Sequence, residues 1–451
     1  MNERQLADRI GNVKDGLVQE ANASQHRKKL WQRLAAVAAA IAIVAGVAGW
    51  LALRGAPLSA SAVDLMAGIN ASKNILTTDV NGPGAAAVTD FGLRLLRECG
   101  AGDKNTLLSP LSVICALGMT ANGAQAETLA QMEQVLGLPM DELNAYLYSY
   151  LAALSPEEIN VANSIWMRDD ESFEVRDAFL QANADYYGAA AYKAPFDKTT
   201  VRDINNWVKD NTHGMIDGIL KELDGAAVMV LVNALAFEAE WTSVYTKDDV
   251  WDRTFTTEDG QERTVEMMYD SLGDYISDDY ADGFIKNYKG GQYAFAALLP
   301  REGMTVAEYL ATLTGESLHE MLVNADSTQY GSTGLPKFKL EYAATLNDAL
   351  IAMGMTDAFD EDAADFDGIG RYVGYMDYPL YIDTVIHKTY IEVAERGTRA
   401  GAATAVAATG GAGMPPSERK DIILDRPFVY MIIDTEANVP IFIGTVLDIG
   451  K

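Results

Sequence analysis

A run of small residues near the C-terminus, residues 395–414, constrains the fold more than any other stretch of the chain. It reads Glu-Arg-Gly-Thr-Arg-Ala-Gly-Ala-Ala-Thr-Ala-Val-Ala-Ala-Thr-Gly-Gly-Ala-Gly-Met, a composition typical of a flexible linker. However, residues 387–394 before it alternate as a strand does, and residues 427–433 and 439–447 after it are apolar runs expected for buried strands. A long segment between strands of one compact domain is uncommon, and where it occurs it is usually functional.

The alternate residues of this run are compact and mostly apolar. From Thr398 to Val406 they are Thr, Ala, Ala, Thr and Val. Because alternate residues of a strand share one face, such side chains would fit between two strands of an existing sheet without a clash. The segment therefore has the pattern of a strand that can enter a sheet.

The first half of this run resembles a segment of a known protein family. The sequence from Glu395 to Thr404 is similar to the hinge of inhibitory serpins, whose pattern is Glu-x-Gly-Thr-x-Ala-Ala-Ala-x-Thr. Gly401 stands where alanine is usual, and Arg399, whose side chain has outward parity, stands where an acid is common. The resemblance identifies these hinge residues: Glu395, Gly397, Thr398, Ala400, Ala402, Ala403 and Thr404.

The resemblance extends over about residues 84–451. Ser109 is a natural helix N-cap with Pro110 at the first helical position, in a segment similar to that around the second serpin helix. Further matching segments are 162–166, 205–208, 233–241, 335–338, 353–355, 364–368, 426–428 and 442–444. The resemblance implies an α+β protein with the serpin fold: a large, mostly antiparallel central sheet, further sheets, about eight to nine helices and an exposed reactive loop at 395–425.

The family's mechanism implies an irreversible, suicide-type inhibitor. A serine protease attacks the loop, and the cut loop inserts into the central sheet and traps the covalent acyl-enzyme. The inhibitor is consumed, needs no cofactor and is not an enzyme. The alternative is a non-inhibitory serpin that acts as a binding or structural protein. Hydrolysis is disfavoured, because Gly-x-Ser-x-Gly is absent and no motif pairs His213, His319 or His387 with a nucleophile.

The attacked bond is expected about 17 residues from Glu395, counted inclusively, which gives Gly411–Ala412. Neighbouring bonds remain open as alternatives, with these further candidates: Thr409, Gly410, Gly413 and Met414. No Arg or Lys lies between Ala400 and Ser417. We therefore expect elastase-like or subtilisin-like target proteases rather than trypsin-like ones.

The resemblance also implies two sites that control how the sheet opens. Ser109, Ser112, Asn233 and His387 would form a hydrogen-bonded cluster, the shutter, where the central strands part. Trp241 would lie at the top of the sheet, at the breach, where the loop enters. Buried polar groups must be paired, so the shutter should set how easily the sheet opens.

The N-terminal part indicates a membrane-anchored, bacterial-type member. Leu34–Leu53 is 20 residues long without a charge, follows a basic segment and has a tryptophan near each end, which is typical of a transmembrane helix. We expect a cytoplasmic segment at 1–33, a tether at 54–83 and an extracellular serpin domain at 84–451. The alternative is a long signal sequence cleaved near Ala62, with secretion of the body.

Charge and composition limit the partners. The net charge is −29, which disfavours nucleic acid and other polyanions as partners.

Cys99 and Cys115 are expected as separate thiols, with a disulfide as the alternative, and no metal site is expected. The acid-rich runs 270–282 and 360–367 lack the EF-hand order, so calcium is disfavoured. We expect a monomer for which loop–sheet polymers are possible.

Overall fold

The computed structural model describes residues 62–72, 75–100, 104–223, 227–373, 380–398 and 419–449. They belong to one compact unit, Leu58–Lys451.

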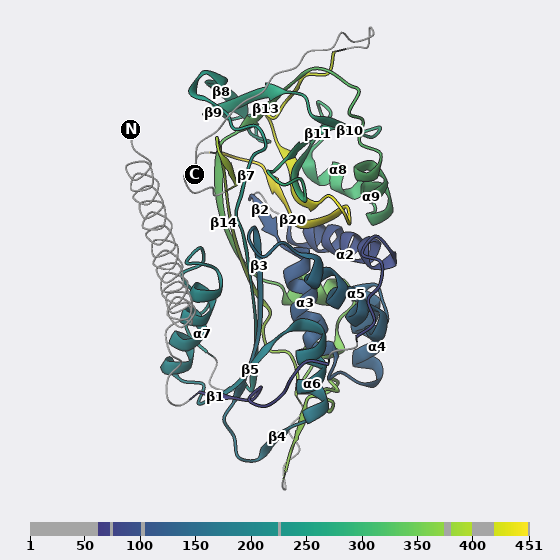
Figure 1. Cartoon of the computed structure of the whole chain (residues 1–451), viewed down its shortest axis with the longest axis vertical. Helices are drawn as coiled ribbons and strands as arrows, with labels where there is room; N and C mark the ends of the chain where they lie inside the picture. Colours follow the sequence, from purple (N-terminus) through teal and green to yellow (C-terminus); the bar gives the residue numbers. More distant parts are fainter. Residues whose placement is uncertain are drawn as a thin grey trace, which may run out of the picture. The chain divides into compact units, whose positions relative to one another are not determined.

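The central sheet has two four-stranded parts. One has the order β1-β5-β3-β6 and the other β14-β16-β17-β7. β6 and β7 follow one another in the chain, and Figure 1 shows β3 and β14 running lengthwise through the molecule. The strands are β1 (Val63–Asp64), β3 (Ile159–Arg168), β5 (Ala190–Ala194), β6 (Met229–Phe237), β7 (Ala239–Glu240), β14 (Phe338–Thr345), β16 (Ile386–Ala394) and β17 (Gly397–Thr398).

Both faces of this sheet are covered. On one face Trp166 of β3 and Val232 of β6 form a small core with Ile204 and Val208 of α7 (Lys198–Asn211). On the other face Ile165 and other residues of these strands join the main core. A strand buried on both faces reads as a continuous apolar run, which explains the sequence of β6.

Two further sheets occupy the upper part of Figure 1. An antiparallel six-stranded sheet has the order β10-β11-β12-β19-β20-β2, and a four-stranded sheet has the order β18-β13-β9-β8. The first comprises β10 (Asp274–Ser277), β11 (Ala281–Asn287), β12 (Tyr293–Pro300), β19 (Phe428–Asp434), β20 (Val439–Val446) and β2 (Thr106–Leu108). The second comprises β18 (Ile422–Ile423), β13 (Ser332–Pro336), β9 (Glu262–Ser271) and β8 (Val250–Thr256), and β4 (Phe173–Val175) pairs separately with β15 (Gly370–Tyr372).

Nine α-helices lie within the described ranges, most of them on the side of the central sheet opposite α7 (Figure 1). Helix α3 begins as the sequence predicts, because Ser109 is its N-cap and accepts a hydrogen bond from the Ser112 amide, with Pro110 at the first position. Helix α3 spans Pro110–Ala121, and the remaining helices are α2 (Pro83–Cys99), α4 (Ala126–Leu136), α5 (Met140–Ala153), α6 (Asp177–Tyr187), α8 (Val306–Thr312), α9 (Gly315–Val323) and α10 (Asn347–Ala352), with short 3-10 helices at Lys247–Asp249 and Asp357–Phe359. The predicted α+β class, with a large central sheet, further sheets and about eight to nine helices, is confirmed over the described residues.

Part of the segment assigned to a tether lies on the body. Val63 and Asp64 pair with Lys193 and Tyr192 of β5, and the Leu65 amide donates to the Ala191 carbonyl at 2.9 Å. This pairing covers the outer edge of β5, which would otherwise expose unpaired backbone groups.

The expected membrane location is not supported. The longest described helix, α2, has 17 residues and carries charged side chains, whereas a span needs about 20 apolar residues. In the part of the chain that the structure describes, no helix is both long and apolar enough to cross a bilayer. Leu34–Leu53 lies outside that part. The single-pass location, and the extracellular placement derived from it, are withdrawn.

Cys99 and Cys115 are both free. Burial raises the pKa of the Cys115 thiol to about 12 and that of the partly buried Cys99 thiol to about 11. Both therefore stay protonated and unreactive at neutral pH.

Candidate functional site

The beginning of the predicted loop is already a strand of the central sheet. β16 ends at Ala394, residues 395–396 turn the chain, and β17 returns between two neighbours. On one side Gly397 and Thr398 pair with Ala394 and Val393 of β16. On the other side they pair with Glu240 and Ala239 of β7. The first two hinge residues after the turn are thus paired on both edges.

Glycine is required at position 397. Its φ of +151° is a conformation that other residues rarely adopt. A Cβ atom there would collide with the carbonyl oxygen of Ala239 and would lie 2.8 Å from Cα of Glu240. The close approach of β17 to β7 therefore depends on Gly397.

Thr398 is enclosed at the head of the sheet. Its side chain is 2% exposed, and its hydroxyl shares a 2.5 Å hydrogen bond with the hydroxyl of Tyr288. The Tyr288 ring stacks on Trp241 with centroids 4.4 Å apart and planes 8° apart. The Trp241 indole N–H in turn donates to the Ala394 carbonyl at 2.8 Å. The predicted breach residue therefore contacts both strands that flank the hinge.

The turn is held by backbone hydrogen bonds and by charge. The Trp241 amide donates to the Arg396 carbonyl at 2.8 Å, and the Tyr245 amide donates to that of Glu395 at 3.0 Å. Lys337 lies 2.8 Å from the Glu395 carboxylate and 2.9 Å from that of Glu266. Partial burial raises the pKa of Glu395, but the hydrogen bond and charge of Lys337 outweigh it and bring that pKa below its usual value. Glu395 is therefore ionised at neutral pH.

The four predicted shutter residues lie close together beneath the sheet. The Ser109 amide donates to Nε2 of His387 at 3.1 Å, and the Ser112 hydroxyl donates to the Asn233 side-chain oxygen. Asn233 then donates its side-chain amide to Asn163 of β3. The chain of bonds connects α3 with β3, β6 and β16, so the strands cannot separate without breaking it.

His387 is neutral in this cluster. It is 4% exposed, and burial lowers its pKa from 6.5 to about 4. Nε2 accepts the Ser109 amide, so the ring proton resides on Nδ1. Protonation of Nε2 would both charge a buried group and remove this acceptor.

Below β17 the two halves of the sheet are not paired. Among the described strands, β6 pairs with β3 and β16 pairs with β14, but no pairing joins β6 to β16. A cavity of about 190 Å³ is lined by residues 229–231 of β6, by residues 383–386 and by residues 219–223. A smaller cavity of about 20 Å³ lies at Ser112, Asn233 and His387. The facing edges of β6 and β16 are thus unpaired below β17, and two cavities lie beside these strands.

The proposed attack site lies outside the described residues. This applies to residues 399–418, which include Ala400, Ala402, Ala403, Thr404 and every candidate for the attacked bond from Thr409 to Met414. The chain is described again from Arg419. Asp421 accepts hydrogen bonds from Arg419 and from the Ser332 amide and hydroxyl, which lower its pKa to about 2. These contacts hold the end of the loop beside β13, where β18 pairs with Thr333 and Gly334.

Sequence reasoning missed three residues of this site: Tyr288, Lys337 and Asn163. Tyr288 lies 110 positions from Thr398 and has no motif around it. Lys337 and Asn163 lie within matching segments, so their positions were marked although their contacts were not.

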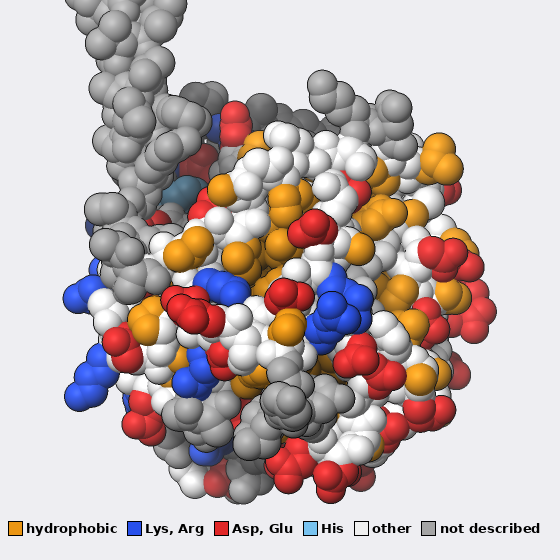
Figure 2. Space-filling view, turned by 90° about the horizontal axis from the view of Figure 1, so that it is seen from below, with side chains coloured by type: hydrophobic (Ala, Val, Ile, Leu, Met, Phe, Trp, Pro, Cys, Tyr) orange, Lys and Arg blue, Asp and Glu red, His pale blue; other side chains and the backbone are white. Residues whose placement is uncertain are grey.

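The chain as a whole is acidic, with a net charge of −29. Figure 2 shows the lower end of the molecule, where acidic side chains are widely spread and basic ones lie between them. No group of His, Cys, Asp or Glu side chains suited to hold a metal ion occurs in the described ranges.

Three comparisons with known proteins agree on the family. The model of the family described as Serpin (serine protease inhibitor) matches residues 86–449. A serpin-like protein of Thermococcus kodakarensis is 30% identical over 81% of this chain and 86% of its own length. The crystal structure of the thermophilic serpin tengpin in its native state is 44% identical, has a TM-score of 0.80 and covers 86% of this chain and all of that one. Tengpin in its latent state gives a TM-score of 0.73 at the same identity, over 83% of this chain and all of that one.

Proposed function

Because the chain belongs to the serpin family of serine protease inhibitors, we propose that it inhibits serine proteases irreversibly, by trapping the acyl-enzyme through insertion of its reactive loop. The narrower assignment as a membrane-anchored, bacterial-type member has no support in the matches. The observation that carries the proposal is the position of β17, whose two residues are paired between β16 and β7.

Insertion would extend this strand. The side chain of Thr398 lies in the interior. Ala400, Ala402 and Thr404 have the same parity as Thr398, so in an inserted strand their side chains would lie below it on the same inward face of the sheet. Their small size suits a narrow slot, and Ala403 between them keeps the opposite face compact. The inserted residues would pair with the unpaired edges of β6 and β16, which gains backbone hydrogen bonds.

The covalent step needs a reactive bond at a suitable distance from the hinge. The protease serine attacks the carbonyl of Gly411, the bond to Ala412 breaks, and Ala412 becomes the amino terminus of a C-terminal fragment that contains β18, β19 and β20. The N-terminal part stays esterified to the protease and is drawn along the sheet. Thr409, Gly410, Gly413 and Met414 remain alternatives for this bond.

The shutter and breach would control the rate of this movement. The bonds among Ser109, Ser112, Asn233 and His387 must rearrange when a strand enters between β6 and β16. Trp241, through its contact with Ala394, would hold the breach in place while β17 lengthens.

The target is proposed to be elastase-like or subtilisin-like. The loop offers Ala, Gly, Thr and Met and lacks basic residues between Ala400 and Ser417. We propose residues 84–451 as the inhibitory domain, acting as a monomer. The unpaired edges below β17 would also accept the loop of a second molecule, which makes loop–sheet polymers possible.

A non-inhibitory binding or structural role is the alternative. It is less well supported, because a protein without loop insertion has no need of a glycine at 397 or of small residues on the inward face of 398–406.

The decisive experiment is incubation of the purified chain with elastase, subtilisin and trypsin. We expect complexes that survive boiling in SDS with elastase or subtilisin, near one inhibitor per protease. Cleavage with full release of active protease would support the non-inhibitory alternative. Absence of any cleavage would contradict both the bait and the mechanism.

A further inference from the structure

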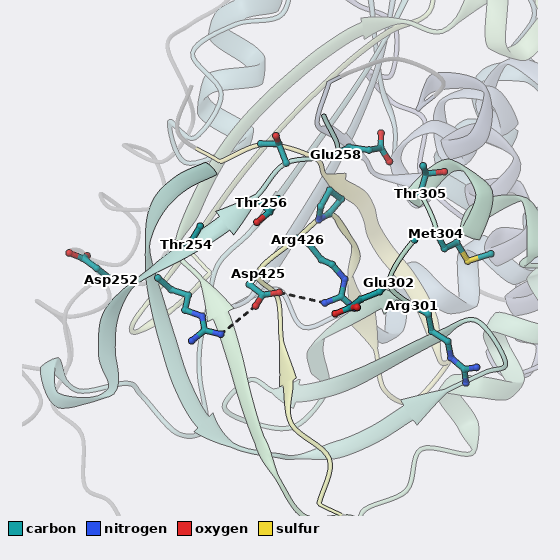
Figure 3. Close-up of a pocket in the computed structure, with 14 residues that line it drawn as sticks. Asp252, Thr254, Thr256, Glu258, Arg301, Glu302, Met304, Thr305, Asp425 and Arg426 are labelled. Carbon is teal, nitrogen blue, oxygen red and sulfur yellow. Dashed lines mark ion pairs between the residues drawn. The ribbon is translucent and has the colours of Figure 1, made fainter. Parts of the chain in front are cut away.

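A polar groove of about 850 Å³ runs beside strand β8, away from the hinge. Figure 3 shows Asp252, Thr254 and Thr256 of β8 along one side, with Glu302 and Thr305 opposite. Asp425 and Arg426 lie between the two sides (Figure 3).

β8 is an edge strand whose outer backbone groups point into this groove. The Thr256 amide donates to the Asp425 carbonyl at 2.8 Å and therefore faces away from β9. Backbone groups alternate along an antiparallel strand, and the pairing of β8 with β9 has no bulge. The amides and carbonyls of Asp252 and Thr254 therefore face the same way as those of Thr256.

The neighbouring strand supports this assignment independently. Glu266 of β9 is the partner of Asp252, and the Glu266 carbonyl accepts the Lys337 amide on the side of β13. Residues directly opposite each other that do not bond to one another both face outward. Among the described residues, the amides of Asp252 and Thr254 have no acceptor, so two donors and two acceptors line the groove.

The edge lacks several usual protections. Exposed edge strands are commonly interrupted by proline, by a bulge or by a covering segment. β8 contains no proline and no bulge, and among the described residues a covering segment bonds to its outer edge only at Thr256, through the Asp425 carbonyl. Its side chains at 251–254 are exposed. Trp251 is 55% exposed, and its ring lies against that of Tyr269, with centroids 4.9 Å apart. An added strand would therefore find both backbone partners and an aromatic surface.

The charges of the groove select the kind of partner. Asp425 lies 3.5 Å from both Arg253 and Arg426, and Arg426 also donates to the Pro300 carbonyl at 2.9 Å. These arginines are thus already engaged. The carboxylates of Asp252 and Glu302 have no ion pair with any described residue, and the whole chain carries a net charge of −29. Arg301, the remaining basic residue of the lining, points away from Asp252 and Thr254 (Figure 3). On the β8 side a cationic segment is therefore attracted, and an anionic one is repelled.

A second copy of this chain is a poor occupant. Antiparallel pairing of two β8 edges through Asp252 and Thr254 would place Arg253 opposite Arg253, and like charges directly opposite are destabilising. Two chains, each with a net charge of −29, would also repel each other.

We propose that the open edge of β8 binds an extended segment of another protein that carries Lys or Arg at alternate positions. The segment adds as a fifth strand of the β18-β13-β9-β8 sheet, pairs with the backbone of Asp252 and Thr254, and places its cationic side chains near Asp252 and Glu302. This surface is separate from the hinge, and the proposal does not depend on protease inhibition.

The first test uses the full chain and a labelled probe peptide, acetyl-Thr-Lys-Val-Lys-Val-Lys-Thr-amide. We expect saturable binding by fluorescence anisotropy that weakens as salt rises. In hydrogen exchange, protection should appear in the fragment that contains Asp252 and Thr254. The same peptide with Glu in place of Lys should bind at least tenfold more weakly. Equal binding of the two peptides, or protection confined to another region, contradicts the proposal.

Backbone pairing is tested with two N-methylated versions of the probe peptide. One version is methylated at its first, third, fifth and seventh residues, the other at its second, fourth and sixth. Only one set of amides faces β8, so one version should lose at least tenfold in affinity while the other keeps it. Similar affinities for both would exclude strand addition, and this comparison needs no change to the protein.

Protein variants locate the site. Thr254→Pro removes an outward amide without touching the pairing to β9, and it should weaken binding at least tenfold, whereas Thr254→Val should retain it. Asp252→Lys combined with Glu302→Lys should reverse the preference toward the Glu peptide. Unchanged peptide binding by both Thr254→Pro and the Asp252→Lys, Glu302→Lys double variant would overturn the proposal. A dimer that forms through β8 in the absence of peptide would also overturn it.

Discussion

The hydroxyl of Thr398 lies 2.5 Å from the hydroxyl of Tyr288, with both side chains almost fully buried. The contact joins the first inward residue of the reactive loop to the aromatic stack on Trp241. In the mechanism proposed above, the first inward position of the hinge would therefore already be paired in the sheet before any protease arrives.

Thr398→Arg should convert the inhibitor into a substrate. The change places a charge where Thr398 is 2% exposed, and a buried charge without a partner costs about 3 kcal/mol or more. If that cost is added to the barrier for insertion, insertion slows more than about a hundredfold, and deacylation of the protease wins. SDS gels should show cleaved inhibitor and free protease. Arg399→Glu, with outward parity, is the matched control and should keep inhibition. Equal loss in the two variants would contradict the parity argument.

Tyr288→Phe should loosen the hinge while leaving the stack on Trp241 in place. Loss of one hydrogen bond costs about 1 kcal/mol, so hydrogen exchange at residues 395–398 should rise about fivefold. Thr398→Val should have a similar effect. Each single variant leaves one buried hydroxyl without its partner, whereas the double variant has neither hydroxyl. The rise in exchange in the double variant should therefore be smaller than the product of the two single effects. Multiplicative effects would mean that the two hydroxyls do not interact.

Gly397→Ala should expel β17 from its place beside β7. The φ of +151° and the collision with the Ala239 carbonyl leave no room for a methyl group, and strain of this kind costs about 1–3 kcal/mol. We expect faster exchange at residues 397–398 and more inhibitor consumed per protease inactivated. Gly401→Ala, which restores the usual family residue, should leave both quantities unchanged. Normal stoichiometry in Gly397→Ala would show that this pairing is not a step of insertion.

His387 should make stability depend on pH between about 6.5 and 4. Its pKa is lowered to about 4 in the fold by burial, against about 6.5 in the unfolded chain. Its contribution is complete above pH 6.5 and is lost as the pH falls toward 4, because the unfolded state takes up the proton first. The loss reaches about 3 kcal/mol. Urea unfolding at pH 7 and pH 4.5 measures it, and His387→Gln should show a smaller difference between the two pH values.

The attacked bond should lie between Thr409 and Met414. The residues there are small and uncharged, so elastase-like enzymes should be inhibited faster than trypsin. Mass spectrometry of the C-terminal fragment, separated from the rest of the chain under denaturing conditions, locates the cut. A stable complex formed by cleavage after Arg399 or Arg419 would overturn both the bond and the target class.

The sequence alone predicts the features that local patterns encode. Ser109 and Pro110 predict the start of α3, and the unbroken apolar run of β6 predicts a strand covered on both faces. The hinge pattern predicts that Gly397 and Thr398 can enter the sheet. Each of these follows from residues that are neighbours in the chain.

Other features depend on contacts between distant residues and have no such signal. Thr398 meets Tyr288 across 110 positions, and nothing in the residues around Tyr288 distinguishes it from other buried tyrosines. The segment that contains Val63 and Asp64 mixes small and polar residues and therefore predicts a tether, yet backbone pairing to β5 places these two residues on the body whatever their side chains are. The outward direction of the Thr254 amide likewise follows from the register with β9.

The double pairing of β17 also bears on how long a molecule remains useful. Because Gly397 and Thr398 are already bonded on both edges, the proposed insertion would start from a partly completed state even while the loop is intact. We expect the active fraction of a stored sample to decline with time in the absence of any protease, while its total protein stays constant. Active-site titration against elastase at intervals measures this decline. The amount of protease that a sample can inactivate would then depend on the age of its molecules as well as on their number.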